Sequence, residues 1–323
     1  MGKLLVSLSI ITIGLLTGYA IQRAVRARLG KEVSLTVPRR VLQRIALLGL
    51  NPIAALGAIW IFELADMRIT LMPVLGVLTL LVGGASGLIG ARILSLPRRQ
   101  AGAFFTASSM FNIGSIGALI VFIFLGERGF ALVPLFRLFE EFSYYAFGFP
   151  IAKSFSPTLS GEHGRRGIRA ILVDPFILMA VGSITLGFVL NILNVPRPAI
   201  YGTINTVIIP VASFLLLVSI GMAMRFGRIR SHLGTAGIVA AIKFLVVPAT
   251  VGTVAWLVGM GSFDGGLPLA VIIVLSSTPV GFIALVPPSI YDLDVDLANA
   301  AWLVTTALLA IVVPLQMLVI GRI

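Results

Sequence analysis

Ten long apolar stretches, each about the length of a membrane crossing, divide the 323-residue chain. A helix needs about 20 apolar residues to cross the hydrocarbon core of a bilayer, so each stretch predicts one transmembrane helix. With 58% hydrophobic and only 11% charged residues, the chain does not have the composition of a soluble globular protein. We expect an all-α integral membrane protein of ten transmembrane helices. The stretches cover residues 4–22, 41–63, 70–95, 103–125, 130–151, 170–194, 204–224, 235–259, 267–286 and 298–320.

The basic residues are divided unevenly between the two sides of these spans. The side with the loops after the first, third, fifth, seventh and ninth spans collects 17 of the 24 Lys and Arg residues, counting Arg44 and Arg92 at the adjoining span ends, and the opposite side collects five. Cytoplasmic loops are enriched in Lys and Arg, so these five loops are predicted to be cytoplasmic and both termini external, in the inner or plasma membrane. The net charge of +12 then reflects topology, and we expect no nucleic-acid partner. Lys3 alone precedes the first apolar core, which favours a retained helix over a signal peptide.

The residue types that build metal sites and catalytic centres are scarce. The chain has no cysteine, and His163 and His232 stand in predicted loops without other ligands at metal-binding spacing. The glycine-rich stretch 83–87 lies within a span with no strand before it, so close helix packing explains it better than a phosphate-binding loop. We expect no metal, no cofactor and no enzymatic activity.

The two halves of the chain, 1–153 and 154–323, resemble each other. Ser108-Ser109 in the fourth span and Ser276-Ser277 in the ninth lie 168 residues apart, and each pair is followed by a short polar break and another apolar helix. Five spans in each half is an odd number, so the second half enters the membrane inverted relative to the first. Inverted repeats of this kind are common in secondary transporters.

Residues that interrupt helices stand at matching positions in the fourth and ninth spans. Asn112, Gly114 and Ser115 interrupt one span, and Pro279 and Gly281 interrupt the other. Backbone groups freed inside a membrane must line a cavity or pack against protein, and half-helix N-termini attract anions. Simple kinks or close helix packing are the alternative. The predicted substrate site comprises Ser108, Ser109, Asn112, Gly114, Ser115, Ser277, Thr278, Pro279 and Gly281.

Charged residues inside two other spans are candidates for coupling or charge compensation. In the fifth span, Arg137 precedes Glu140 and Glu141 by three and four residues, which brings both carboxylates within its reach. One of them is a candidate for proton coupling, with a structural ion pair as the alternative. Lys243 in the eighth span is predicted to snorkel to the interface, to pair with Glu140 or to attract the substrate carboxylate.

Several of these motifs are similar to those of the auxin efflux carrier family of membrane transporters. Residues 111–117, Phe-Asn-Ile-Gly-Ser-Ile-Gly, resemble the family's fourth helix, although Ala118 stands near a position where the family often has proline. Pro279 and the acidic turn and alanine-rich segment 290–298 resemble its ninth and tenth helices. The resemblance implies a ten-helix fold shared with bile-acid/sodium symporters. Helices 3–5 and 8–10 would form a transport core that slides against a scaffold of helices 1, 2, 6 and 7 as an elevator.

The resemblance implies a carrier of small organic acids, in a scaffold-mediated homodimer surrounded by membrane lipid. The bile-acid relatives bind sodium through acidic and amide groups in the ninth helix, whereas residues 276–281 here contain neither. We therefore expect proton coupling or facilitated diffusion of the anion. The alternatives are a sodium-coupled bile-acid-type symporter and a membrane sensor that binds a ligand without transporting it. Separately, Asp292, Asp294 and Asp296 precede the tenth span and are predicted to cap its helix.

Overall fold

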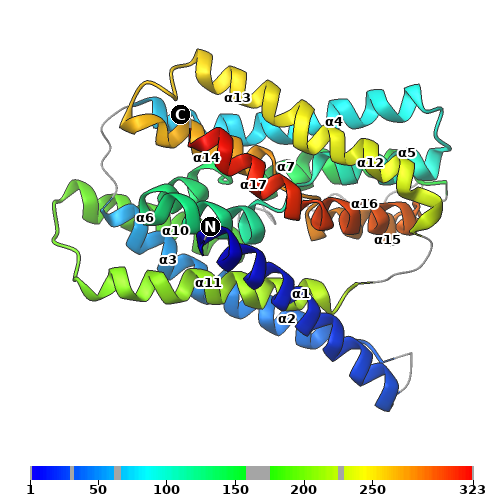
Figure 1. Cartoon of the computed structure of the whole chain (residues 1–323), viewed down its shortest axis with the longest axis horizontal. Helices are drawn as coiled ribbons and strands as arrows, with labels where there is room; N and C mark the ends of the chain where they lie inside the picture. The colour runs from blue at the N-terminus through cyan, green and yellow to red at the C-terminus, as the bar shows by residue number, and fades with distance from the viewer. Residues whose placement is uncertain (1, 30–32, 62–66, 158–174, 225–228, 322–323) are drawn as a thin grey trace. The chain divides into compact units, whose positions relative to one another are not determined.

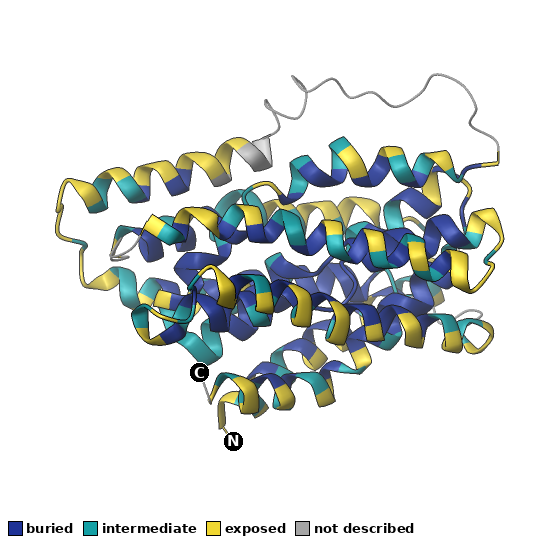
Figure 2. Cartoon of the chain, turned by 90° about the horizontal axis from the view of Figure 1, so that it is seen from above, coloured by how far each residue is buried: buried dark blue, intermediate teal, exposed yellow. Residues whose placement is uncertain are grey.

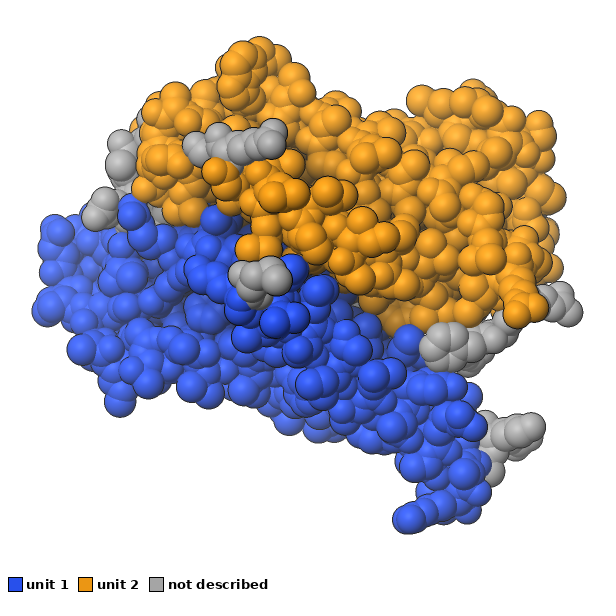
Figure 3. All heavy atoms as spheres, viewed as in Figure 1, with its two compact units in different colours: residues 1–64, 114–134, 174–225 blue, residues 65–113, 135–173, 226–323 orange. Residues whose placement is uncertain are grey.

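The computed structural model describes residues 2–29, 33–61, 67–157, 175–224 and 229–321. The described residues are predominantly helical, and among them no β-strand occurs apart from one isolated β-bridge (Figure 1). They divide into two compact units, coloured separately in Figure 3. Unit 1 comprises residues 1–64, 114–134 and 174–225, and unit 2 comprises residues 65–113, 135–173 and 226–323. Each unit therefore draws on both halves of the chain.

Unit 1 is built around two close helix pairs. α1 (Gly2–Leu29) packs on α11 (Ile200–Gly221), and α10 (Pro175–Ile192) packs on α3 (Asn51–Trp60). A Cβ atom on Gly18 would overlap the carbonyl oxygen of Val218, and one on Gly221 would overlap that of Leu15. These two glycines let the backbones of α1 and α11 touch, as small residues do between membrane helices. α2 (Thr36–Arg44) continues into α3 through a π-turn at Ile45–Leu50.

Residues 114–134 of unit 1 fall largely in α6 (Ala118–Phe136), which is two helices joined at a kink. Gly126 at the kink has φ 71° and ψ −165°, a backbone conformation open to glycine and costly for other residues. The kink lies where the sequence predicts a polar break between the fourth and fifth spans. The resemblance places this segment in the transport core, whereas it packs with the residues expected in the scaffold.

Unit 2 contains the remaining helices. From the first half of the chain come α4 (Met72–Ile93), α5 (Arg98–Ser109), α7 (Glu140–Ser143) and α8 (Phe149–Ser154), with a π-helical segment at Tyr144–Gly148. A further π-helical segment, Ile113–Gly117, starts in unit 2 and belongs to unit 1 from Gly114 on. From the second half come α12 (Leu233–Ala241), α13 (Val247–Leu257), α14 (Leu267–Ser276), α15 (Val286–Ile290), α16 (Val295–Ala307) and α17 (Leu309–Ile320), with a π-turn at Ile242–Val246. Short 3₁₀ turns lie at Met67–Leu71, Arg230–His232, Asp264–Gly266 and Phe282–Leu285.

The glycine-rich stretch of α4 serves close packing, as the sequence predicts. A Cβ atom on Gly83 would overlap the carbonyl oxygen of Ser108, and one on Gly87 would lie 2.8 Å from the Ser108 Cβ. Both contacts bring α4 against α5, the helix that leads into the fourth-span interruption.

Six described helices or joined helical segments are long and apolar enough to cross a membrane, and a seventh candidate is the pair α16–α17, bent by 50° at Leu308. They include Gly2–Leu29, Thr36–Trp60 and the 42-residue segment Ile113–Ser154. Exposed large apolar side chains such as Leu16, Trp256 and Leu318 lie on these helices, and exposed and buried residues alternate along them in Figure 2. The chain is thus a multi-pass, all-helical membrane protein. Ten crossings remain a prediction, because the fourth and ninth spans are interrupted and the start of the sixth lies outside the described residues.

Candidate functional site

Two helices of unit 2 stop inside their spans. α5 ends at Ser109, Met110 is extended (φ −106°, ψ 124°), and helical structure resumes at Ile113. α14 ends at Ser276, Gly281 is extended (φ −71°, ψ 146°), and helical structure resumes at Phe282. We call residues 110–112 the first break and residues 277–281 the second break. The interrupted helices predicted from Asn112, Pro279 and Gly281 are therefore confirmed.

The two breaks are joined to each other as an isolated antiparallel bridge between Phe111 and Val280. The Asn112 N–H donates to the Pro279 carbonyl at 3.0 Å, and the Gly281 N–H donates to the Met110 carbonyl at 2.9 Å. A membrane interior offers no water to unpaired backbone groups. Each break therefore provides hydrogen-bond partners for some of the backbone groups that the other break leaves unpaired. A Cβ atom on Gly281 would lie 2.5 Å from the Phe111 carbonyl oxygen, so this approach requires glycine.

Side chains of Lys243 and Tyr144 form hydrogen bonds with both ends of the peptide unit that joins Met110 to Phe111 in the first break. The Lys243 Nζ donates to the Met110 carbonyl at 2.9 Å and lies 3.2 Å from the centre of the Phe111 ring. The Phe111 N–H, at the other end of the same peptide unit, donates to the Tyr144 Oη at 3.1 Å. Lys243 is fully buried, so its ammonium does not snorkel to an interface. It places its amine nitrogen beside the joined breaks.

Tyr144 connects the first break to the ion pair of the fifth span. Its hydroxyl donates to the Glu140 Oε1 at 2.9 Å, and the Arg137 Nε donates to the Glu140 Oε2 at 2.8 Å. The three-residue spacing predicted this ion pair. Glu140 is buried, and Glu141 follows it on α7. The sequence did not predict the role of Tyr144, because one more aromatic residue in an apolar span gives no local indication of a hydrogen-bonding role.

Neutral side chains of the last span hold the second break. The Val280 N–H donates to the Thr305 Oγ1 at 3.1 Å, and the Gln316 Nε2 donates to the Ser277 Oγ at 2.7 Å. Thr305 and Gln316 are both buried. Polar residues inside an otherwise apolar span were the signal that could have identified them.

The remaining predicted site residues lie around the breaks or in the other unit. Ser108, Ser109 and Thr278 are buried in unit 2. The hydroxyls of Ser109 and Thr278 donate to carbonyls one turn earlier, whereas the Ser108 Oγ has no hydrogen-bond partner among the described residues. Gly114 and Ser115 belong to unit 1. No group of three or more His, Asp or Glu side chains within the described ranges is placed to hold a metal ion.

Unit 1 holds a second polar cluster that the sequence did not predict. Glu127 accepts hydrogen bonds from Arg197, in an ion pair, and from the Asn205 Nδ2 at 2.6 Å. The Arg197 Nη1 also donates to the Gly57 carbonyl at 2.8 Å, and Asn205 donates to the Ala54 carbonyl at 3.2 Å. The cluster thereby ties α6 and α11 to α3.

The acidic turn before the last span behaves as predicted at one position. The Asp294 carboxylate accepts from the Leu297 N–H at 2.9 Å, which makes Asp294 the N-cap of α16. Asp292 instead forms an exposed ion pair with Arg99, at 2.6 Å between Oδ1 and Nη2.

Comparison with known proteins points to transport. No protein-family model matches the chain. It is 24% identical over 322 residues, 99% of each chain, to an uncharacterized transporter of Methanothermobacter thermautotrophicus. It is also 27% identical over 249 residues to an uncharacterized transporter of Methanocaldococcus jannaschii, covering 73% of this chain and 74% of that one. Together with the apolar helices, these similarities support a membrane transporter.

Proposed function

We propose that the protein is a secondary or facilitative transporter of small organic anions, with its substrate site at the joined breaks. The observation that carries the proposal is the Phe111–Val280 bridge, which brings interrupted helices from both halves of the chain to one point. Transporters built from inverted repeats commonly bind substrate where broken helices meet. The proposed family is that of the auxin efflux carriers, and the proposed setting is the cell membrane, with both termini outside and the protein as a homodimer.

A carboxylate suits the chemistry around the breaks. Helical structure restarts at Ile113 and at Phe282, just after each break, and the first N–H groups of a helix favour negative charge. The Asn112 amide and the Ser108 hydroxyl would donate neutral hydrogen bonds to the carboxylate. Ser109, Ser115, Ser277 and Thr278 would line the site, and Gly114, Pro279 and Gly281 would shape its backbone. Lys243 would attract the anion with a full positive charge.

The proposed mechanism is elevator-type alternating access. A transport core of helices 3–5 and 8–10 would carry the joined breaks past a scaffold of helices 1, 2, 6 and 7. Sodium coupling is not part of the proposal, because residues 276–281 offer neither carboxylate nor amide. Glu140 or Glu141, balanced by Arg137, would be the residue that exchanges a proton if transport is proton-coupled.

The test is transport by the purified protein in proteoliposomes, using a panel of small carboxylates with and without sodium. Currents on a solid-supported membrane detect net charge movement, and counterflow of labelled acids detects electroneutral exchange. We expect sodium-independent transport that Asn112→Ala abolishes and Asn191→Ala preserves. Asn191 is the matched control because its amide donates to the Trp60 carbonyl in unit 1.

Other outcomes separate the alternatives. Transport that stops when choline replaces sodium would favour a bile-acid-type symporter. Binding of a carboxylate without flux in either assay would favour a membrane sensor. Unchanged transport of every substrate by Asn112→Ala would exclude the joined breaks as the site.

A further inference from the structure

Lys243 differs from the other ionisable side chains near the joined breaks in having no ion pair. It is fully buried, and its Nζ contacts the Met110 carbonyl at 2.9 Å and the Phe111 ring, whose centre is 3.2 Å away. A carbonyl dipole and an aromatic face both attract a cation, but neither carries a net negative charge. No carboxylate within the described ranges pairs with Lys243. A buried ammonium without a counter-ion is costly, and a neutral amine is much less so.

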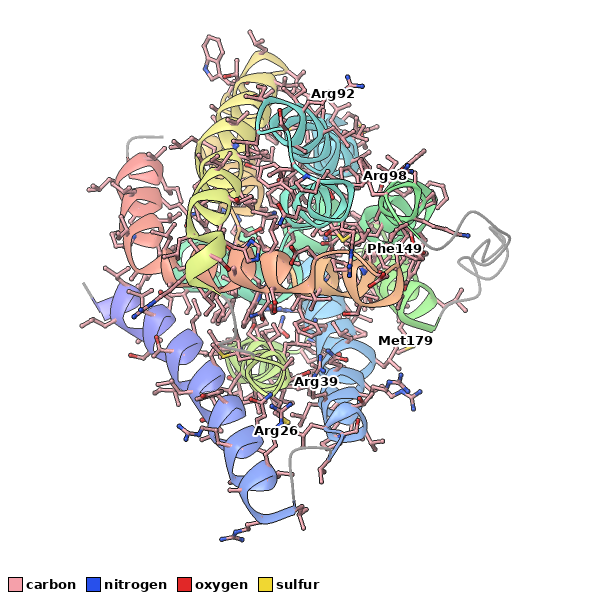
Figure 4. All side chains as sticks on the ribbon, turned by 90° about the vertical axis from the view of Figure 1, so that its right-hand side faces the viewer. Arg26, Arg39, Arg92, Arg98, Phe149 and Met179 are labelled. Carbon is pink, nitrogen blue, oxygen red and sulfur yellow. The ribbon has the colours of Figure 1, made fainter. Side chains whose placement is uncertain are left out.

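The helices around Lys243 supply no counter-charge. The residue lies in the π-helical segment between α12 and α13, which packs on α4 and meets the end of α5 at Met110. These four helices contain no Asp or Glu. Their charged side chains are Arg92 at the end of α4 and Arg98 and Arg99 at the start of α5, and all three are exposed; Arg92 and Arg98 are labelled in Figure 4.

Glu140 is connected to Lys243 through the first break, but its charge is already balanced. The Arg137 Nε donates to one carboxylate oxygen and the Tyr144 hydroxyl donates to the other. Both oxygens therefore accept a hydrogen bond, and neither needs to carry a proton in this arrangement. Tyr144 and the Met110–Phe111 peptide unit stand between Glu140 and Lys243. The Arg137–Glu140 ion pair is thus complete without Lys243.

The burial of Lys243 suits a proton that is transported together with another ion. An amine in contact with water would exchange its proton at every stage of a transport cycle, and the proton would then cross without the anion. Lys243 is closed to solvent in the described arrangement, so its proton exchanges only when the joined breaks open. A carboxylate bound at the breaks would enter by the same opening and would supply the missing counter-charge.

We propose that Lys243 binds the coupling proton together with the substrate carboxylate and releases both on the other side of the membrane. This inference rests on the proposed transport site and assigns the coupling proton to Lys243 in place of Glu140 or Glu141. The amine takes up one proton as one carboxylate binds, so a monocarboxylate and its proton cross with no net charge. An N–H of either form can donate to the Met110 carbonyl, so the first break keeps its support throughout the cycle.

The experiment is nitrogen-15 NMR of the lysine side chains in the full chain, reconstituted in lipid nanodiscs. The chain has four lysines, so Lys3→Arg, Lys31→Arg and Lys153→Arg together leave Lys243 as the one labelled amine. A neutral amine and an ammonium give nitrogen resonances at different positions. We expect a neutral amine at neutral pH without ligand, and its conversion to an ammonium by saturating acetate, malonate or malate at the same pH.

The pH dependence of carboxylate binding measures the same linkage. Uptake of one proton with each carboxylate should weaken the apparent affinity by about tenfold for each unit of pH above neutrality. Lys243→Arg keeps a positive charge at every accessible pH, so it should bind without this dependence. Glu140→Gln and Glu141→Gln should keep the dependence, which either substitution would abolish if that carboxylate carried the proton.

Three results would overturn the proposal. An ammonium at neutral pH without ligand would show that Lys243 does not exchange a proton. A neutral amine that none of the three carboxylates converts would show that its protonation is not linked to the anion. A pH dependence that persists in Lys243→Arg and disappears in Glu140→Gln or Glu141→Gln would assign the proton to a glutamate.

Failure of the proposed function gives a different result, because transport is measured as flux. An ammonium in the empty protein, in a chain that transports carboxylates, would overturn this inference alone. Conversion of the amine by a carboxylate without flux would overturn transport and leave Lys243 as the residue whose protonation accompanies anion binding.

Discussion

The two breaks have similar backbone shapes but different chemical support. Each is a short extended segment between two helical pieces, and each donates one N–H to a carbonyl of the other. The first break is held by the Lys243 ammonium and by Tyr144, whose hydroxyl donates to Glu140. The second is held by the neutral side chains of Thr305 and Gln316.

This difference indicates how inverted repeats can diverge while they keep a common geometry. Any hydrogen-bond donor or acceptor in a suitable position can pair with a freed backbone group. The need to pair these groups therefore does not determine which residue types support a break. A buried charged side chain restricts the residue types more than a freed backbone group does, because a buried charge needs a partner. The ionisable groups therefore lie around the first break, whereas the second break contributes Gly281, whose backbone lies close to the Phe111 carbonyl oxygen. We infer that the first break governs the electrostatics of the proposed substrate site and the second break governs its shape.

The largest effect is expected where the two breaks touch. Gly281→Ala places a methyl group 2.5 Å from the Phe111 carbonyl oxygen, which forces the bridge apart. Overpacking of this kind costs about 2–3 kcal/mol, and transport should be lost. Unfolding in mixed micelles with increasing SDS measures the change in stability.

Gly237→Ala on α12 is the control for that change, because a Cβ atom there meets nothing within 4 Å. It should leave transport intact and raise stability slightly, since alanine is the better helix former. If Gly281→Ala transports normally, the close approach of the breaks is not required for function.

Removal of the charge at the first break should produce the next largest effect. Lys243→Met keeps a long side chain but loses the charge-assisted hydrogen bond to Met110, a contribution of about 1.5–3 kcal/mol. We expect the transport rate to fall by about tenfold or more. Counterflow at several substrate concentrations checks this, and Lys243→Arg should restore part of the rate. Equal loss in the Arg and Met variants would assign Lys243 a role in shape alone.

A smaller effect is expected from the phenol that supports the first break. Tyr144→Phe deletes one oxygen and leaves the Phe111 N–H and Glu140 without their shared partner. An unsatisfied buried group costs about 1–3 kcal/mol, so we expect a loss of about 2 kcal/mol in SDS unfolding. Tyr201→Phe on α11 is the control, and its ring should keep its contact with Trp60. The importance of the Tyr144 hydroxyl would be refuted if both variants unfolded alike.

The sequence predicts those features of the two breaks that depend on residues close together in the chain. Asn112, Pro279 and Gly281 disfavour helical structure at matching positions of two spans, so the positions of both breaks could be predicted from them. The type of residue alone is not enough, because Pro210 lies inside the unbroken helix α11. The Arg137–Glu140 pair followed from a three-residue spacing, although Arg137 lies in the turn between α6 and α7. Asp294 capped its helix for the same local reason.

The parts that the sequence could not predict depend on contacts between distant residues. Lys243 reaches a carbonyl 133 positions away, and Glu127 pairs with an arginine 70 positions away. A periodic apolar pattern fixes which residues share a helix face, but it does not state which faces meet. The Lys243 side chain was therefore open to several predicted partners, and its contact with Met110 emerged only from the packing of unit 2.

The smallest effect is expected from a substitution at the second break, whose supporting side chains are neutral. Thr305→Val keeps the shape of the side chain and removes the oxygen that accepts from the Val280 N–H. Because no charge is left unpaired, we expect a loss of about 1 kcal/mol in SDS unfolding and transport that retains its substrate preference. Thr250→Val on α13 is the control, since its exposed hydroxyl donates only to a carbonyl of its own helix. If Thr305→Val instead weakened transport as much as Lys243→Met, the two breaks would contribute equally to the electrostatics, and the division of roles between them would be wrong.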